Sequence, residues 1–218
     1  QNKFIEKRTT SDGFPKNLLI ENDSGRAEVL LKGSAVENLS LILRNGDIIK
    51  ELRDEVDAYE YDLTIIGGSA KRSMSHDMIQ YINSSIFVVN NFNKIINYKI
   101  LLAVDDSPGT KKAVKYGVRV AQAFGIKVQI ITVNEDDNSS EANKKSSENA
   151  SKMMRRCGVE AETKFEIGKP VDKIIELAGE DHIIIMGAST QSPIAKFFTG
   201  SKPLNVMQNS NCPILIVK

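Results

Sequence analysis

The chain repeats part of its own sequence, and this repeat restricts its fold more than any other feature. Asp62-Leu-Thr-Ile-Ile-Gly-Gly parallels Asp181-His-Ile-Ile-Ile-Met-Gly, and Ser84-Ser-Ile-Phe-Val-Val parallels Cys212-Pro-Ile-Leu-Ile-Val. Apolar runs without polar alternation are typical of strands buried on both faces of a parallel sheet. Between these runs, apolar residues recur with the spacing of an α-helix. Alternating strands and helices predict an α/β fold with right-handed crossovers and a doubly wound sheet.

The two copies differ in completeness. The second begins with Ile100-Leu-Leu-Ala-Val-Asp-Asp-Ser-Pro108, a strand, turn and helix start that nothing before Lys16 resembles. We therefore predict two Rossmann-like, doubly wound parallel five-stranded sheets of order 3-2-1-4-5, the first lacking its opening strand and helix. In this first copy, the spacing of apolar residues predicts a helix over 25–36, between strands at 16–21 and 39–43. The predicted domains are an arm or linker at 1–15, a degenerate domain at 16–92, a linker at 93–97 and a complete domain at 98–218.

Composition excludes several classes of function. With 29 basic and 28 acidic residues the net charge is +1, so we expect no nucleic-acid partner. No apolar run approaches about 18 residues, and we expect no direct insertion into a membrane. Cys157 and Cys212 lie far apart without a C-x-x-C motif, which argues against a disulfide framework or a zinc site. A reducing, cytoplasmic location is the default for such a chain.

The last strand, loop and helix start of the second copy predict a nucleotide site. Gly187 ends an apolar run, and Gly200-Ser201 precedes a short helix. A glycine at a strand end lets a ligand approach the backbone, and the N–H groups at a helix start favour an anion such as phosphate. In a doubly wound sheet, ligands bind where strands one and four diverge. Asp105 and Gly187 end those two predicted strands.

These residues resemble the universal stress protein family in a tandem arrangement, well over about 98–218 and more weakly over about 16–92. The resemblance rests on Val104-Asp-Asp-Ser after the first strand, on Gly168 before its helix and on the terminal signature. In the nucleotide-binding branch this signature is Gly, two residues, Gly, nine residues, Gly, then Ser or Thr. The same spacing is kept here, with threonine replacing one glycine, by Gly187, Thr190, Gly200 and Ser201.

The resemblance implies ATP or a related adenine nucleotide as the ligand. Asp105 would lie beside the adenine and ribose, Val133 would line the adenine pocket, and Gly187, Gly200 and Ser201 would hold phosphates. Three residues that depart from the family pattern alter this expectation. Thr190 adds a side chain whose hydroxyl can donate one hydrogen bond, and Lys202 brings a positive charge within reach of a phosphate. Pro203, beside Lys202, removes a backbone donor.

Two further questions stay open at the level of sequence. Asp105 and Asp106 are candidates for contact with Mg²⁺ beside the phosphates, although Asp106 is equally suited to cap the following helix. In the first copy, Arg72-Ser73 stands where Gly200-Ser201 would be, and the first strand with its aspartate is missing. We expect no complete nucleotide pocket in that copy.

Three functions compete. The leading hypothesis is a nucleotide-binding regulatory protein of the stress response with at most weak ATPase activity, because no general base is apparent. The second is a nucleotide-free tandem scaffold, in which Ile86–Val89 pairs with Ile214–Val217 to form an internal pseudo-dimer. A homodimer and attachment to a larger transporter or kinase as its regulatory tail are compatible with this second hypothesis. An adenylating ligase is disfavoured, since Ser-Gly-Gly-x-Asp-Ser and His-x-Gly-His are absent from the sequence.

Overall fold

The computed structural model describes residues 18–23, 26–31, 40–43, 46–67, 77–89, 97–136, 141–188 and 202–218. The chain divides into two compact units, Gln1–Glu51 and Leu52–Lys218. Helix α2 (Ile48–Tyr59) starts in the first unit and continues into the second. Its start is capped by Asp47, whose carboxylate accepts a hydrogen bond from the Lys50 amide at 2.9 Å.

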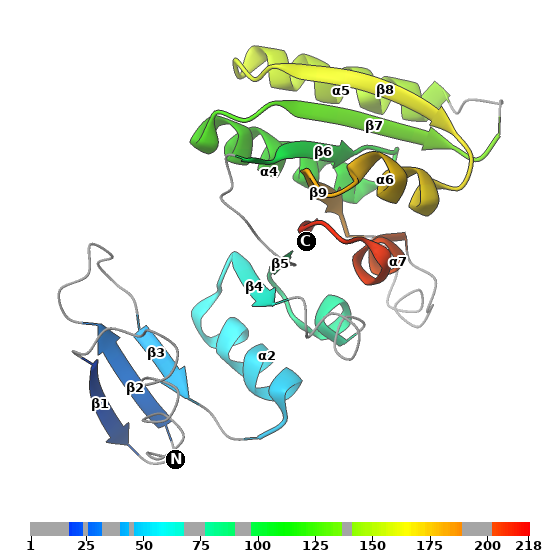
Figure 1. Cartoon of the computed structure of the whole chain (residues 1–218). Helices are drawn as coiled ribbons and strands as arrows, with labels where there is room; N and C mark the ends of the chain where they lie inside the picture. The colour runs from blue at the N-terminus through cyan, green and yellow to red at the C-terminus, as the bar shows by residue number, and fades with distance from the viewer. Residues whose placement is uncertain are drawn as a thin grey trace. The chain divides into compact units, whose positions relative to one another are not determined.

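The first unit contains a three-stranded antiparallel sheet, drawn in blue in Figure 1. Its strands, in spatial order, are β1 (Leu18–Asp23), β2 (Arg26–Leu31) and β3 (Ser40–Leu43). The predicted helix over 25–36 is therefore wrong. Ala27, Val29 and Leu31 also recur with the two-residue period of a strand. The register pairs Asp23 with Arg26, which leaves a two-residue connection of the length that favours a β-hairpin.

The second unit is built on a mostly parallel sheet with the strand order β4-β5-β10-β9-β6-β7-β8. These seven strands are β4 (Leu63–Gly67), β5 (Ser85–Val89), β6 (Lys99–Ala103), β7 (Val128–Asn134), β8 (Ala161–Ile167), β9 (His182–Gly187) and β10 (Ile214–Val217). The five strands of the second copy, from β8 through β7, β6 and β9 to β10, follow the order 3-2-1-4-5. In the part of the first copy that the structure describes, β4 and β5 do not belong to a separate five-stranded sheet, because they extend the sheet of the second copy.

Helices cover both faces of the strands of the second copy (Figure 1). One face carries α4 (Pro108–Phe124) and α5 (Glu141–Arg156), and the other carries α6 (Pro170–Ala178) and α7 (Lys202–Asn209). Under α4 and α5, fully buried aliphatic side chains such as Ile100, Leu102 and Ile130 form the core. No helix in the part of the chain that the structure describes is long and apolar enough to cross a membrane.

The predicted joint between Ile86–Val89 and Ile214–Val217 is confirmed. β5 and β10 pair antiparallel, with Ile86 opposite Ile216 and Val88 opposite Ile214. All four side chains are fully buried. β5 continues in parallel to β4, and β10 continues in parallel to β9. The joint therefore converts the open edge of the second copy into the interior of a larger sheet.

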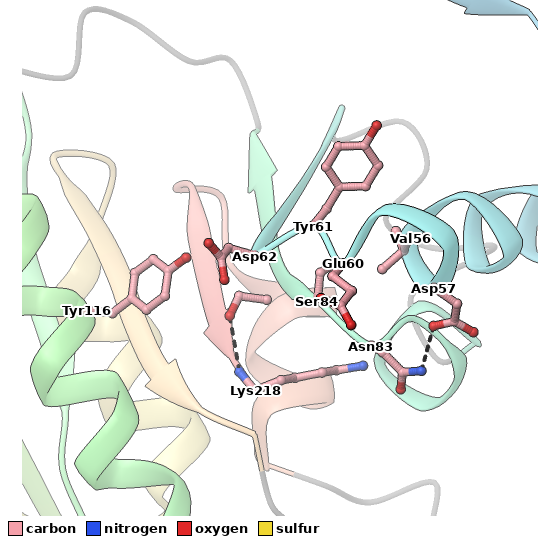
Figure 2. A pocket seen from close by; sticks show the side chains of 10 residues that line it. Val56, Asp57, Glu60, Tyr61, Asp62, Asn83, Ser84, Tyr116 and Lys218 are labelled. Atoms are coloured by element: carbon pink, nitrogen blue, oxygen red, sulfur yellow. Dashed lines mark hydrogen bonds between the residues drawn. The ribbon is translucent and has the colours of Figure 1, made fainter.

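Lys218, which follows β10, makes polar contacts that stabilise the joint. It also lines a pocket of about 410 Å³ (Figure 2). The backbone N–H of Lys218 donates to the Ser85 hydroxyl at 3.3 Å. Its ammonium group donates to the carbonyl oxygen of Met78 at 3.3 Å and to that of Ile82. These two carbonyls lie at the end of the helical turn that precedes β5, where a cation is favoured by the helix dipole.

Replacing Lys218 is expected to loosen the joint. Lys218→Met keeps most of the apolar stem but removes the ammonium donor from the Met78 and Ile82 carbonyls. We expect the free energy of unfolding, measured by urea denaturation, to fall by about 1–2 kcal/mol. The matched control is Lys127→Met, because the Lys127 ammonium forms a solvent-exposed ion pair with Glu160, and such pairs contribute little to stability. A loss no larger than that of the control would contradict this role of Lys218.

Candidate functional site

A pocket of about 420 Å³ lies at the carboxyl ends of β6, β7 and β9. It brings together Asp105, Val133, Gly187 and Lys202, four of the residues predicted from the sequence. Asp105 follows β6, Val133 is on β7, Gly187 ends β9 and Lys202 opens α7. The other three predicted residues, Thr190, Gly200 and Ser201, lie outside the described residues. The pocket occupies the place where the strand order of the second copy reverses.

Asp105 is held in place by the first turn of α4. Its Oδ1 accepts hydrogen bonds from the Ser107 hydroxyl at 2.5 Å, the Thr110 hydroxyl at 2.7 Å and the Ser107 amide at 3.1 Å. The Asp105 amide in turn donates to the Thr110 hydroxyl at 3.3 Å. These contacts fix the direction of the carboxylate before any ligand binds.

The same contacts keep Asp105 ionised. Burial alone raises the pKa of its carboxyl, because removal from water disfavours the charged form. The hydrogen bonds from Ser107 and Thr110, together with the positive charge of Lys202, outweigh burial and bring the pKa below its ordinary value. A fixed negative charge therefore faces Lys202 across the pocket at neutral pH.

Three helices begin at this pocket. Pro108 opens α4, Pro170 opens α6 and Lys202 opens α7, and all three residues line the cavity. The predicted start of α4 is confirmed, with Ser107 as N-cap and Pro108 as the first helical residue. The Ser107 hydroxyl serves Asp105 instead of capping its own helix. Helix starts carry partial positive charge and unpaired N–H groups, so their convergence favours an anionic ligand group.

Gly187 is a glycine for a reason that the sequence did not reveal. A Cβ atom at this position would lie closer than 3.0 Å to backbone atoms of Gly109, in the first turn of α4. A Cβ atom at Gly109 would lie equally close to the carbonyl oxygen of Ala188. The two glycines therefore let α4 pack directly on the end of β9. Contact of Gly187 with a phosphate stays a prediction.

One wall of the pocket is apolar. Val133 and Ile131 contribute side chains from β7, Val104 follows β6, and Met186 belongs to β9. Ile131 is 1% exposed and Val104 is 3% exposed, so this wall is part of the core of the unit. An apolar wall opposite a carboxylate and helix starts suits a ligand with a flat apolar part and a charged part.

The described residues do not form a metal site of their own. No group of three histidine, cysteine, aspartate or glutamate side chains that could hold a metal ion occurs among them. Oδ1 of Asp105 is already occupied by three donors, and Lys202 adds positive charge nearby. Contact of Asp105 with Mg²⁺ therefore requires the phosphates of a ligand to supply most of the coordination.

Two polar residues of the site were missed by sequence reasoning. Thr110 donates to Asp105, and its position three residues after Ser107 places it on the same first turn of α4. Asn143 accepts from the Asp106 amide at 3.0 Å and donates to the Asn134 side chain at 2.9 Å. It lies in the first turn of α5, which begins at Glu141. No pattern in the sequence distinguishes Asn143 from its polar neighbours.

Comparisons with known proteins agree on one family. The model of the Universal stress protein family matches residues 97–218. A universal stress protein of Thermus aquaticus is 30% identical over 133 residues, 55% of this chain and 97% of the relative. Universal stress protein MJ0531 of Methanocaldococcus jannaschii is 25% identical over 138 residues, 55% of this chain and 81% of the relative.

A solved structure is similar over more of the chain. The crystal structure of a universal stress protein from Archaeoglobus fulgidus matches 80% of this chain and 66% of its own, with a TM-score of 0.63 and 19% identity. At this identity the likeness concerns the fold alone. Residues 97–218 make up less than 80% of this chain. The match to the solved structure therefore also includes residues of the first copy.

Proposed function

Because the chain belongs to the universal stress protein family, we propose that its second copy binds an adenine nucleotide in the pocket beyond β6, β7 and β9. The observation that carries this proposal is the convergence of Asp105, Val133 and Lys202 on one pocket, although the sequence separates them widely. Together they supply an acceptor, an apolar surface and a cation. These are the three groups that recognise a ribose, a base and a phosphate.

The ribose end is assigned to Asp105. Three donors occupy its Oδ1, which leaves Oδ2 as the acceptor for a ribose hydroxyl. The lowered pKa keeps this acceptor charged at neutral pH, and hydrogen bonds to a charged acceptor are stronger than neutral ones. The apolar wall around Val133 and Ile131 would take the adenine ring.

The phosphates are assigned to the side of the pocket where Lys202 and the helix starts converge. A phosphate there would gain from the ammonium charge and from the positive ends of α4 and α7. Gly200, Ser201 and Thr190 precede Lys202 in the sequence and would add backbone and hydroxyl donors, as the family resemblance implies. Lys202 is a departure from the family pattern, and we propose that it compensates for Pro203, which has no backbone donor.

We propose regulation through binding, with at most weak hydrolysis. A general base works best when its pKa lies near the working pH, and the pKa of Asp105 lies below its ordinary value. The site would instead couple ligand binding to the packing of α4, α6 and α7, whose first residues surround it. A nucleotide-free scaffold is the second candidate, and the antiparallel β5–β10 joint supports it.

Calorimetric titration of the purified chain with ATP, ADP, AMP, cAMP and adenosine tests the proposal. We expect saturable binding of at least one phosphorylated nucleotide. Lys202→Ala is expected to weaken that binding about twofold to tenfold and to leave adenosine unaffected, because only the phosphate contact is lost. Lys111→Ala is the matched control, since Lys111 lies on α4 but does not line the pocket. A protein that ignores all five ligands at millimolar concentration would support the scaffold instead.

A further inference from the structure

The outermost strand β8 carries an arrangement of residues that the nucleotide site does not use. β8 pairs with β7 on one side, and no other described strand pairs with it (Figure 1). At the opposite end of the second copy, β10 is already covered by β5. An exposed edge strand is a surface on which another strand can pair, unless its side chains prevent this.

Side chains of β8 alternate between two classes. Phe165 is 49% exposed and Ile167 is 54% exposed, so two large apolar side chains of one sheet face lie largely in solvent. Lys164 and Glu166 belong to the other face and form an ion pair at 2.8 Å. Charges usually protect an edge strand against pairing. Here the two charges have opposite sign and stand on either side of Phe165.

Backbone hydrogen bonds show which groups of β8 point outward. The Gly168 N–H donates to the Asn134 carbonyl, and the Glu160 carbonyl accepts from Val128. The even-numbered residues of β8 thus direct their backbone groups toward β7, and the odd-numbered residues direct theirs away from it. The outward N–H and C=O groups belong to Thr163, Phe165 and Ile167.

We propose that two copies of the chain associate by antiparallel pairing of their β8 strands, centred on Phe165. Phe165 would then lie opposite Phe165 of the second copy, as a hydrogen-bonded pair. Lys164 would face Glu166 of the second copy twice, once on each side of the symmetry axis. Such self-complementarity is what a two-fold interface between identical chains requires. Ile167 would lie opposite Thr163, which brings both exposed apolar side chains into the contact.

The neighbouring registers are disfavoured by charge. Centring the pair on Lys164 places lysine against lysine and Glu162 against Glu166, and centring it on Glu166 places glutamate against glutamate. Centring it on Thr163 joins Glu162 to Lys164 but places Glu160 against Glu166, and it leaves Ile167 without a partner residue inside β8. The register centred on Phe165 joins opposite charges and covers the apolar residues at the same time.

The decisive experiment mixes two charge-reversal variants and measures mass by sedimentation velocity. Lys164→Glu gives β8 two negative charges beside Phe165, and Glu166→Lys gives β8 two positive charges. Lys173 of α6, 3.8 Å from Glu166 in the wild type, is the same in both variants. Each variant alone is expected to dimerise at least tenfold more weakly than the wild type, because like charges then face each other across the axis. An equimolar mixture is expected to form a heterodimer with affinity within about threefold of the wild type. Neither variant has the ion pair between residues 164 and 166 within its own chain, so the recovery would come from pairs between the two chains.

A cross-linking experiment checks the register. Phe165→Cys places two thiols opposite each other across a pair of about 5.5 Å between Cα atoms, within the range of a disulfide. Thr163→Cys is the control, because two such residues would be separated by about 14 Å along the strands. We expect a linked dimer from the first variant alone under mild oxidation. A monomeric wild type, a dimer indifferent to both charge reversals, or equal linking of the two cysteine variants would overturn the proposal.

Discussion

Gly109→Ala is expected to cause the largest loss of stability of any single-methyl change on α4. The added Cβ atom would lie closer than 3.0 Å to the Ala188 carbonyl oxygen, and the atoms around it belong to backbone and cannot rotate away. Helix α4 would have to move off the end of β9. We expect the free energy of unfolding to fall by about 3 kcal/mol or more, at the upper end of the cost of overpacking.

Gly117→Ala on the same helix is the matched control. Its Cβ atom would lie 3.4 Å from the Met154 methyl carbon, an ordinary contact. Because alanine favours a helix interior over glycine, we expect this variant to be as stable as the wild type or more stable by about 0.5–1 kcal/mol. Urea denaturation of both variants provides the measurement. Equal stability of the two would show that α4 and β9 do not pack through their glycines.

Asp105→Asn is expected to weaken nucleotide binding about tenfold to a hundredfold while the protein stays folded. The amide oxygen of asparagine can still accept from Ser107 and Thr110, so the turn before α4 keeps its contacts. The amide nitrogen replaces Oδ2 and cannot accept a hydrogen bond from a ribose. A lost hydrogen bond to a charged group accounts for the expected change. Calorimetry with the best-bound nucleotide measures it, and unchanged affinity would remove Asp105 from the site.

The same variant reports on the protonation of Asp105. In the folded protein the pKa of this carboxyl lies below its ordinary value, so its ionised form stabilises the fold. This contribution is fully present above the unfolded-state pKa of about 3.9 and is lost as the pH falls through the lower folded-state pKa. The difference in free energy of unfolding between wild type and Asp105→Asn should therefore shrink below about pH 4. A difference that is constant from pH 7 to pH 3 would contradict the assignment.

The sequence predicted the second copy and the joint better than the first copy. Apolar runs such as Ile183–Met186 favour a strand buried on both faces, because they are short, rich in isoleucine and followed by a glycine. The repeat then matched Ile86–Val89 to Ile214–Val217 and indicated that these strands pair. At Ala27, Val29 and Leu31 the spacing fits a helix as well as a strand, and the hairpin connection decides between them. The merging of both copies into one sheet depends on tertiary pairing that a local pattern does not contain.

The candidate site was predictable only where the family signature names residues. Asp105, Val133 and Gly187, which the family resemblance names, line one pocket together with Lys202, which departs from the family pattern. Thr110 and Asn143 were missed, because each acts through a contact that only the folded chain creates. The requirement for glycine at 187 was predicted for a ligand, and the structure adds a different cause in Gly109. The sequence motif thus predicted residues that line one pocket but did not reveal the contacts that support them.

The β5–β10 joint also determines when the second unit can finish folding during synthesis. Ser85 meets Lys218 across 133 residues of chain, and β5 cannot pair with β10 until that length has left the ribosome. At about 5–20 residues per second the wait is on the order of ten seconds. During this time β5 exposes the apolar side chains of Ile86 and Val88 without their final neighbour. Because both parts of the chain share one sheet, the nascent chain is prone to aggregation during this interval. A chaperone that holds extended apolar segments would act on this part of the nascent chain.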